Sequence, residues 1–418
     1  MRILIWMFLS LPLVGFCQKT GLSIQEGLSW KKILKKAQTE HKNIFVDCYA
    51  TWCGPCKYMN EKIFPAGEVG QMMNEKYISI EVQMDSTKKD SPDVKSWYTQ
   101  ATWFKKTYKI DAYPTFLFFS PNGRPIHKFV GSSEKVKEFL EKVKDVDSVD
   151  KQYFTLVDHY KEHLGDSAFL VHALVAALKA NDNPNAALIG DAYVDCLKNP
   201  FIKTNLKLIA AAPLSTSSKG FKIFYTHPAE IDTALGINTA DDFIVNIVRR
   251  EEVGPLLVKG APSVDWDELS NKLRIKYPRQ AERVITESKL VYYAGRQMWN
   301  EYGRSLVQLI NYTPQMDAYN LNEAAWSIFL KCSEPEVLQQ ALSWSQRTIT
   351  NRNDVINANY VDTYANLLYK ASHIDEAIIW EQKAYSLASA QQNMSQSENF
   401  SKTILRMKNG EKIWESPL

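Results

Sequence analysis

Residues 44–57 read Ile44-Phe45-Val46-Asp47-Cys48-Tyr49-Ala50-Thr51-Trp52-Cys53-Gly54-Pro55-Cys56-Lys57. The first seven residues are a short, mostly apolar run, which predicts a buried strand over 44–50. Two cysteines separated by two residues follow, and the residues after them favour a helix to about Ile63. The pattern therefore predicts that Cys53 stands at the N-terminus of a helix that begins directly after a buried strand.

This position gives the two cysteines different chemistry. The unpaired N–H groups and the dipole of a helix N-terminus stabilise a thiolate, so we expect Cys53 to be the attacking sulfur. Cys56 lies one turn into the helix, where we expect it to be more buried and to resolve a mixed disulfide. A structural disulfide is one alternative. A zinc site is another, but it needs four ligands and the chain has no second Cys-x-x-Cys.

Segments on either side of this motif alternate between helical and strand patterns. Helices are predicted over 28–39, over 96–108 and from 131 onward, and further strands over 77–82, 113–119 and 126–130. The sequence Pro121-Asn122-Gly123 is typical of a hairpin turn between the last two strands. This order predicts an α/β fold in which helices cover a sheet.

Taken together, the motifs resemble the thioredoxin family over residues 18–147. The resemblance is carried by Val46-Asp47, Trp52-Cys53-Gly54-Pro55-Cys56-Lys57, Tyr113-Pro114-Thr115, Asn122-Gly123 and Val130-Gly131. It implies a thioredoxin fold with a central mixed sheet flanked by helices, and no metal or cofactor besides the redox-active pair Cys53–Cys56.

The resemblance also implies roles for single residues. Asp47, whose pKa burial should raise, would relay a proton to or from Cys56. Pro114 would be a cis-proline opposite the disulfide, next to main-chain groups that pair with a substrate strand. The remaining implied site residues are Trp52, Gly54 and Pro55 in the motif, and Tyr113, Thr115 and Gly131 as substrate contacts. Cys48 points to the other face of its strand, which predicts a buried, inert thiol.

Two features depart from the family pattern. The stretch 85–111 is long and carries Trp97-Tyr98 and Trp103-Phe104 on a predicted helix. These aromatic residues either pack on the sheet or shape substrate choice near Pro114. Tyr113 stands where a β-branched residue is commoner, so the reduction potential and the substrate preference are less directly inherited.

The N-terminus has the pattern of a secretory signal peptide. Met1-Arg2 precedes a short apolar run, and Gly15 and Cys17 are small residues near its end. We therefore predict a signal peptide over 1–17 and export, which means the periplasm in a bacterium with two membranes. Secretion and a lipid anchor at Cys17 are the alternatives, although Phe16 is larger than lipoprotein signals favour.

Helical patterns dominate beyond the polar junction 144–150, which predicts an all-α domain over 148–418. Ala341 and Ala377 hold equivalent places in two similar segments and lie 36 residues apart, close to the tetratricopeptide period of about 34. We predict such repeats near 322–354 and 358–390, with a peptide or protein ligand.

A second chemistry in this region is not apparent. His159 and His163 lie at i, i+4 without a visible third ligand, so no metal site is predicted. A disulfide between Cys196 and Cys332 is left open, and burial of both is the simpler expectation.

Composition narrows the function classes. The 418 residues allow two or three domains, and 23% charged residues are ordinary for a globular chain. Fifty Lys and Arg against 47 Asp and Glu exclude the basic excess of a dedicated nucleic-acid binder. Six cysteines are too few for a disulfide-stapled scaffold.

The sequence thus favours an exported thiol–disulfide oxidoreductase that acts on protein disulfides. Gly54-Pro55 and Asp47 resemble reducing members, which favours a reductase supplied by a membrane thiol electron donor. A disulfide oxidase or isomerase is one alternative. The other is an interaction protein whose helical repeats bind a partner and whose redox site is accessory.

Overall fold

The computed structural model describes residues 21–258, 263–350 and 356–414. The chain forms two compact units, Met1–Ile237 and Asn238–Leu418. The predicted signal peptide 1–17, with Cys17, lies outside the described residues. None of the helices in the described ranges combines the length and the apolar composition that crossing a bilayer requires.

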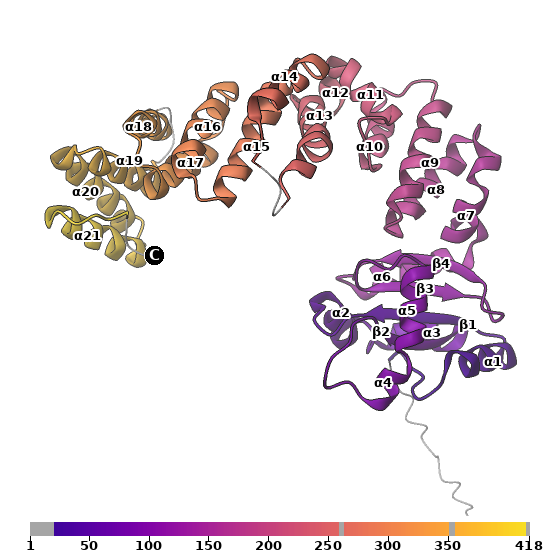
Figure 1. The fold of residues 1–418 in the computed structure, drawn as a ribbon. Coiled ribbons are helices and arrows are strands. Elements are labelled where there is room, and N and C mark those ends of the chain that lie inside the picture. Colours follow the sequence, from indigo (N-terminus) through magenta and orange to yellow (C-terminus); the bar gives the residue numbers. More distant parts are fainter. Residues whose placement is uncertain (1–20, 259–262, 351–355, 415–418) are drawn as a thin grey trace, which may run out of the picture. The chain divides into compact units, whose positions relative to one another are not determined.

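The first unit is built on a four-stranded mixed sheet (Figure 1). Its strands, in the spatial order β2-β1-β3-β4, are β1 (Asn43–Tyr49), β2 (Tyr77–Gln83), β3 (Thr115–Phe119) and β4 (Pro125–Val130). β1 and β2 run parallel, whereas β3 is antiparallel to both β1 and β4. The carboxyl ends of β1 and β2 therefore meet at one edge of the sheet, where the cysteine pair follows β1.

Helices cover both faces of the sheet, because successive side chains of a strand point to opposite faces and both sets are largely apolar here. The helices are α1 (Trp30–Glu40), α2 (Gly54–Tyr58), a π-helical turn η1 (Met59–Ile63), α3 (Gly67–Lys76), α4 (Pro92–Ser96), α5 (Tyr98–Thr107) and α6 (Val136–Lys144). Val46 and Cys48 share a core with α1 and α5. Phe45, Phe116 and Phe118 share the other core with η1, α3 and α6.

The helix after the cysteine pair ends at Ile63, as predicted. A second helix, α3, begins at Gly67 and was not predicted. Pro65 lies between them, and a proline cannot donate the backbone hydrogen bond that a continuous helix requires. The predicted strands and the helices α1, α5 and α6 are present.

The aromatic residues of the stretch 85–111 mostly pack on the fold. Phe104 is fully buried in the core under α5, and Trp97 is half-buried against it. The Tyr98 hydroxyl donates a hydrogen bond to Asp90, 2.6 Å away. Only Trp103 of the four projects outward, with 45% of its surface exposed.

Six further helices belong to the first unit. They are α7 (Tyr153–His159), α8 (Ser167–Lys179), α9 (Asn183–Cys196), α10 (Lys203–Ala211), α11 (Lys219–Thr226) and α12 (Pro228–Leu235). The backbone N–H of Tyr153 donates to Nδ1 of His127 on β4, 3.0 Å away. Asn181, between α8 and α9, donates to Asp111, 2.9 Å away. The predicted domain boundary at 147/148 therefore lies inside a compact unit that extends to Ile237.

The second unit consists of helices joined by loops in its described residues. Its helices are α13 (Thr239–Val248), α14 (Trp266–Lys276), α15 (Ala281–Gly295), α16 (Trp299–Tyr312), α17 (Ala318–Lys331), α18 (Pro335–Thr350), α19 (Ala358–Lys370), α20 (Ile374–Ala390) and α21 (Met394–Lys408). The segments 322–354 and 358–390 hold the helix pairs α17–α18 and α19–α20. Ala341 and Ala377 are fully buried in their common core. The tetratricopeptide assignment itself stays a prediction.

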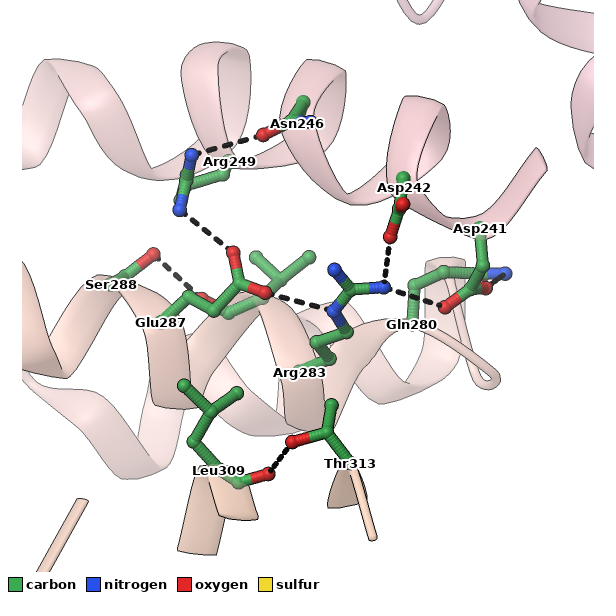
Figure 2. Close-up of polar contacts among 11 residues, drawn as sticks. Asp241, Asp242, Asn246, Arg249, Gln280, Arg283, Glu287, Ser288, Leu309 and Thr313 are labelled. Atoms are coloured by element: carbon green, nitrogen blue, oxygen red, sulfur yellow. Dashed lines mark hydrogen bonds and ion pairs between the residues drawn. The ribbon is translucent and has the colours of Figure 1, made fainter. Parts of the chain in front are cut away.

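Charged side chains join α13 to α15, as Figure 2 shows. Arg283 of α15 contacts Asp242 at 2.7 Å and Asp241 at 3.5 Å, and its Nε lies 2.8 Å from Glu287. Glu287 also accepts from Arg249 at 2.7 Å. Arg283 thus sits at the centre of a network that spans the two helices.

A buried acidic pair lies between α19 and α20. Glu381 is fully buried, and neither of its carboxyl oxygens has a hydrogen-bond partner among the described residues. Burial raises the pKa of Glu381 well above its usual range, and the negative charge of Asp362 raises it further. Burial and the neighbouring carboxyl group therefore favour the protonated form of Glu381.

Candidate active site

The two cysteines after β1 form a disulfide, with an S–S distance of 2.04 Å and a Cα–Cα distance of 5.3 Å. Cys53 is the residue that caps the N-terminus of α2. Its sulfur accepts a hydrogen bond from the backbone N–H of Cys56, 3.1 Å away. The predicted place of Cys53 at the start of a helix is confirmed. Pro55 lies in the first turn, where its missing N–H group leaves no carbonyl unpaired.

Both sulfur-bearing residues are covered. Cys53 is 3% exposed and Cys56 is 2% exposed, so Cys56 is the more buried residue, as expected, but only by a small margin in this disulfide-bonded form. The side chains of Tyr49 and Tyr113 both pack against the pair. Trp52 is 70% exposed and meets the Tyr113 ring edge-on, with 5.8 Å between ring centroids. Two aromatic rings therefore border the approach to Cys53.

The loop before β3 is held beside the cysteines. The Tyr113–Pro114 peptide bond is cis, as the resemblance implied. The Pro114 carbonyl accepts a hydrogen bond from the N–H of Gly131, 2.9 Å away, and Gly131 has a φ of +98° that favours glycine. Thr115 is fully buried and its hydroxyl donates to the Ala112 carbonyl. The Thr115 side chain therefore braces the loop.

Asp47 lies inside the protein on β1. It is 1% exposed, and neither carboxyl oxygen has a hydrogen-bond partner among the described residues. It shares its strand face with Phe45, whose core includes Met59 in the turn that continues α2. Burial raises the pKa of the Asp47 carboxyl well above its usual range, and the charge of Glu81 raises it further. The pKa of Asp47 is thus shifted in the direction that burial predicts.

Two acidic residues at this site were missed by the sequence analysis. Asp85 follows β2 and accepts two hydrogen bonds from Thr51, one from its N–H at 3.0 Å and one from its hydroxyl at 2.5 Å. Asp85 therefore fixes the loop that leads into Trp52 and Cys53. Glu81 on β2 is the register partner of Asp47. A prediction that the two strands pair in parallel would have placed both residues at the site, because the carboxyl ends of parallel strands lie at the same edge of the sheet.

The three other cysteines of the described residues, Cys48, Cys196 and Cys332, carry free thiols. Cys48 is buried on the face opposite to Asp47, and burial raises the pKa of its thiol, as predicted for an inert residue. Cys332 is buried, whereas Cys196 is only half-buried, so the expected burial holds for one of them. Across the part of the chain that the structure describes, no group of three His, Cys, Asp or Glu residues could hold a metal ion. His159 pairs with Glu162 instead.

Residues 30–147 match the family model described as a thioredoxin-like domain. The chloroplastic thioredoxin Y of Oryza sativa subsp. japonica is 36% identical over 111 residues, which cover 25% of this chain and 49% of that protein. The thioredoxin of Mycoplasmoides gallisepticum is 33% identical over 118 residues, which cover 27% of this chain and 99% of that protein.

A solved structure is also similar. The solution structure of a candidate disulphide-isomerase from Bacteroides thetaiotaomicron is 32% identical, with a TM-score of 0.26, and the match covers 31% of this chain and 94% of that one. The chain spans about half the length of the chloroplastic relatives that it matches.

Proposed function

Because the chain belongs to the thioredoxin family through residues 30–147, we propose that it is an exported thiol–disulfide oxidoreductase that reduces disulfides in cell-envelope proteins. The observation that carries the proposal is the arrangement around Cys53. This residue caps α2, it lies under Tyr113 of the cis-proline loop, and it follows the strand that holds the buried carboxyl of Asp47.

The proposed reaction is dithiol–disulfide exchange. The Cys53 thiolate attacks a substrate disulfide, forms a mixed disulfide and releases one substrate thiolate. The thiol of Cys56 then gives its proton to the Asp47 carboxylate, and its sulfur bonds to Cys53. The bond between Cys53 and the substrate breaks, and its electron pair leaves with the second substrate sulfur. Two electrons pass from the cysteine pair to the substrate, and the protein ends oxidised.

Two sequence features support the reductive direction. Gly54 and Pro55 between the cysteines, together with Asp47, resemble the reducing members of the family. Each turnover leaves Cys53 and Cys56 oxidised, so the cycle needs a thiol donor. We place that donor in the membrane, because the predicted signal peptide directs the chain out of the cytoplasm, and periplasm is the favoured compartment. Lipid anchoring at Cys17 would hold the protein near the same donor.

The measurement that tests the direction is the reduction potential of Cys53–Cys56, taken by equilibrating the mature chain with glutathione buffers. We expect a value near that of thioredoxin, about −270 mV, instead of the value near about −120 mV of a strong envelope oxidant. A value near the second figure would overturn the reductase proposal in favour of a disulfide oxidase or isomerase.

The competing function is a scaffold whose helical region binds a protein and whose redox site is accessory. The second unit supports this alternative, because it has its own core of helices from α16 to α21. Cys53→Ser separates the two. An enzyme loses both turnover and its biological effect with this substitution, whereas a scaffold keeps its partner and its effect.

A further inference from the structure

The carboxyl group of Asp47 does not contact solvent directly. The residue is 1% exposed, and both oxygens lack a partner among the described residues. A proton that Asp47 takes from Cys56 must nevertheless leave before the next turnover. Some neighbouring group therefore has to connect this carboxyl with solvent.

Glu81 is the titratable neighbour placed to do so. It pairs with Asp47 in the register of β1 and β2, and register partners on adjacent strands project to the same face. Unlike Asp47, it is half-buried. Its side chain lines two hollows that open to solvent, one of 330 Å³ beside Tyr49 and one of 480 Å³ beside Asn60.

The charged residues that line the two hollows beside Glu81 are all negative. Glu26, before α1, and Asp93, on α4, line the same hollow as Glu81. Among the described residues, neither hollow is lined by a lysine or an arginine. Burial raises the pKa of Glu81, a hydrogen bond from the Asn60 side chain lowers it, and the charge of Glu26 raises it. The negative charge of one carboxyl group beside another, with no cation between them, raises the pKa of its neighbour.

We propose that Glu81 is a positioning residue of the redox site, whose negative charge beside Asp47 keeps that carboxyl basic enough to deprotonate Cys56 and whose own carboxyl group passes the proton to water. The inference rests on the proposed function, because it needs Asp47 to act on Cys56. When Cys56 attacks Cys53, its proton goes to Asp47, and the Asp47 proton then moves through Glu81 to the hollow. No electron passes through either carboxyl group.

The test follows the two thiol steps separately with Ellman's reagent. The reduced mature chain, in a Cys196→Ser background, is mixed with one equivalent of the reagent in a stopped-flow instrument. The first release of thionitrobenzoate reports attack by Cys53, and the second reports attack by Cys56. Both rates are recorded from pH 5 to pH 10 and compared among Glu81→Gln, Glu81→Lys, Asp47→Asn and the parent chain.

We expect the charge at residue 81 to set the pH at which the rate of the second release reaches its inflection. Glu81→Gln should lower that inflection by about one pH unit and slow its plateau about threefold, because Asp47 becomes a weaker base. Glu81→Lys should lower the inflection further. The first release should stay within about twofold of the parent, because Cys53 acts before the proton transfer. Two variants are used so that poor folding of one leaves the other informative.

Glu61→Gln is the matched control, because Glu61 is an exposed carboxylate next to Asn60. It should leave both releases unchanged. If Glu81→Gln and Glu81→Lys keep the parent inflection while Asp47→Asn removes it, the role of Glu81 is wrong and the proposed function stands. If the parent gives no first release, the proposed function fails together with this inference.

Discussion

At the scale of single residues, access to Cys53 is set by the aromatic ring of Tyr113. This ring packs on the disulfide and meets Trp52 edge-on, so a substrate must pass two aromatic side chains. The family pattern has a smaller, β-branched residue in the place of Tyr113. We infer that this tyrosine restricts attack on the pair to substrates that can displace its ring.

Tyr113→Ala should therefore speed the reaction of the reduced protein with small disulfides. Removing the ring uncovers Cys53, and thiol–disulfide exchange is limited by access. We expect the first release of thionitrobenzoate from Ellman's reagent to become about threefold faster. Trp103→Ala, at another exposed aromatic ring, is the control and should change nothing. A slower reaction of Tyr113→Ala would show that the ring guides small disulfides instead of restricting them.

At the scale of elements, α7 is attached to the sheet by a histidine that must stay neutral. His127 is 1% exposed, and burial lowers its pKa from 6.5 to about 4. Its Nδ1 accepts the N–H of Tyr153, so this nitrogen carries no proton in the folded state. The unfolded chain takes up a proton below pH 6.5, whereas the folded chain does so only near pH 4.

The contribution of His127 to the free energy of unfolding should consequently fall as the pH drops from 7 to 4. His127 contributes a loss of about 3 kcal/mol across this window, because the unfolded state binds the proton first. His127→Asn keeps an acceptor for Tyr153 but does not titrate, so its loss should be smaller by that amount. Urea unfolding at both pH values measures the difference. Equal losses in the parent and the variant would contradict the assignment.

The contact between α13 and α15 depends on the positive charge of Arg283. Its removal would leave Asp241, Asp242 and Glu287 as a group of like charges. We expect Arg283→Ala to cost about 1–2 kcal/mol, because Arg283 and Glu287 are partly buried and share several contacts. Arg250→Ala, an exposed arginine paired with Glu251, should cost less than about 0.5 kcal/mol. Urea unfolding compares the two, and equal losses would show that the network has no special role.

At the scale of the whole molecule, the chain has two compact units with separate cores. Each unit contains a buried carboxyl group whose pKa is raised above that of the unfolded chain, Asp47 in one and Glu381 in the other. The folded state therefore holds these protons longer than the unfolded state does. Stability falls as the pH rises from the usual carboxyl range through the raised pKa.

Asp47→Asn and Glu381→Gln should each stabilise one unit only. Both amides are neutral at any pH, so we expect a gain of about 1–3 kcal/mol at pH 8 and little change at pH 4. In calorimetry of the full chain, Asp47→Asn should raise one transition and Glu381→Gln the other. If either substitution moved both transitions equally, the two units would unfold as one.

Local sequence determined the first part of this fold and the position of its reactive pair. A buried run followed by Cys53-Gly54-Pro55-Cys56 specifies a strand and a helix start, because periodicity, proline and the cysteine spacing act over a few residues. The expectations for Asp47 and Pro114 came from the resemblance to the thioredoxin family, since each belongs to a short motif with a fixed place in the chain order.

The tertiary structure decided what lies next to these residues. Glu81 and Asp85 became part of the site only through the parallel pairing of β1 and β2, which brings together segments more than thirty residues apart. The burial of Cys53 by Tyr113 and the attachment of α7 through His127 arose in the same way. Local patterns report which faces of an element are apolar, whereas long-range packing selects the partner of each face, and the chemistry of a buried group depends on that partner.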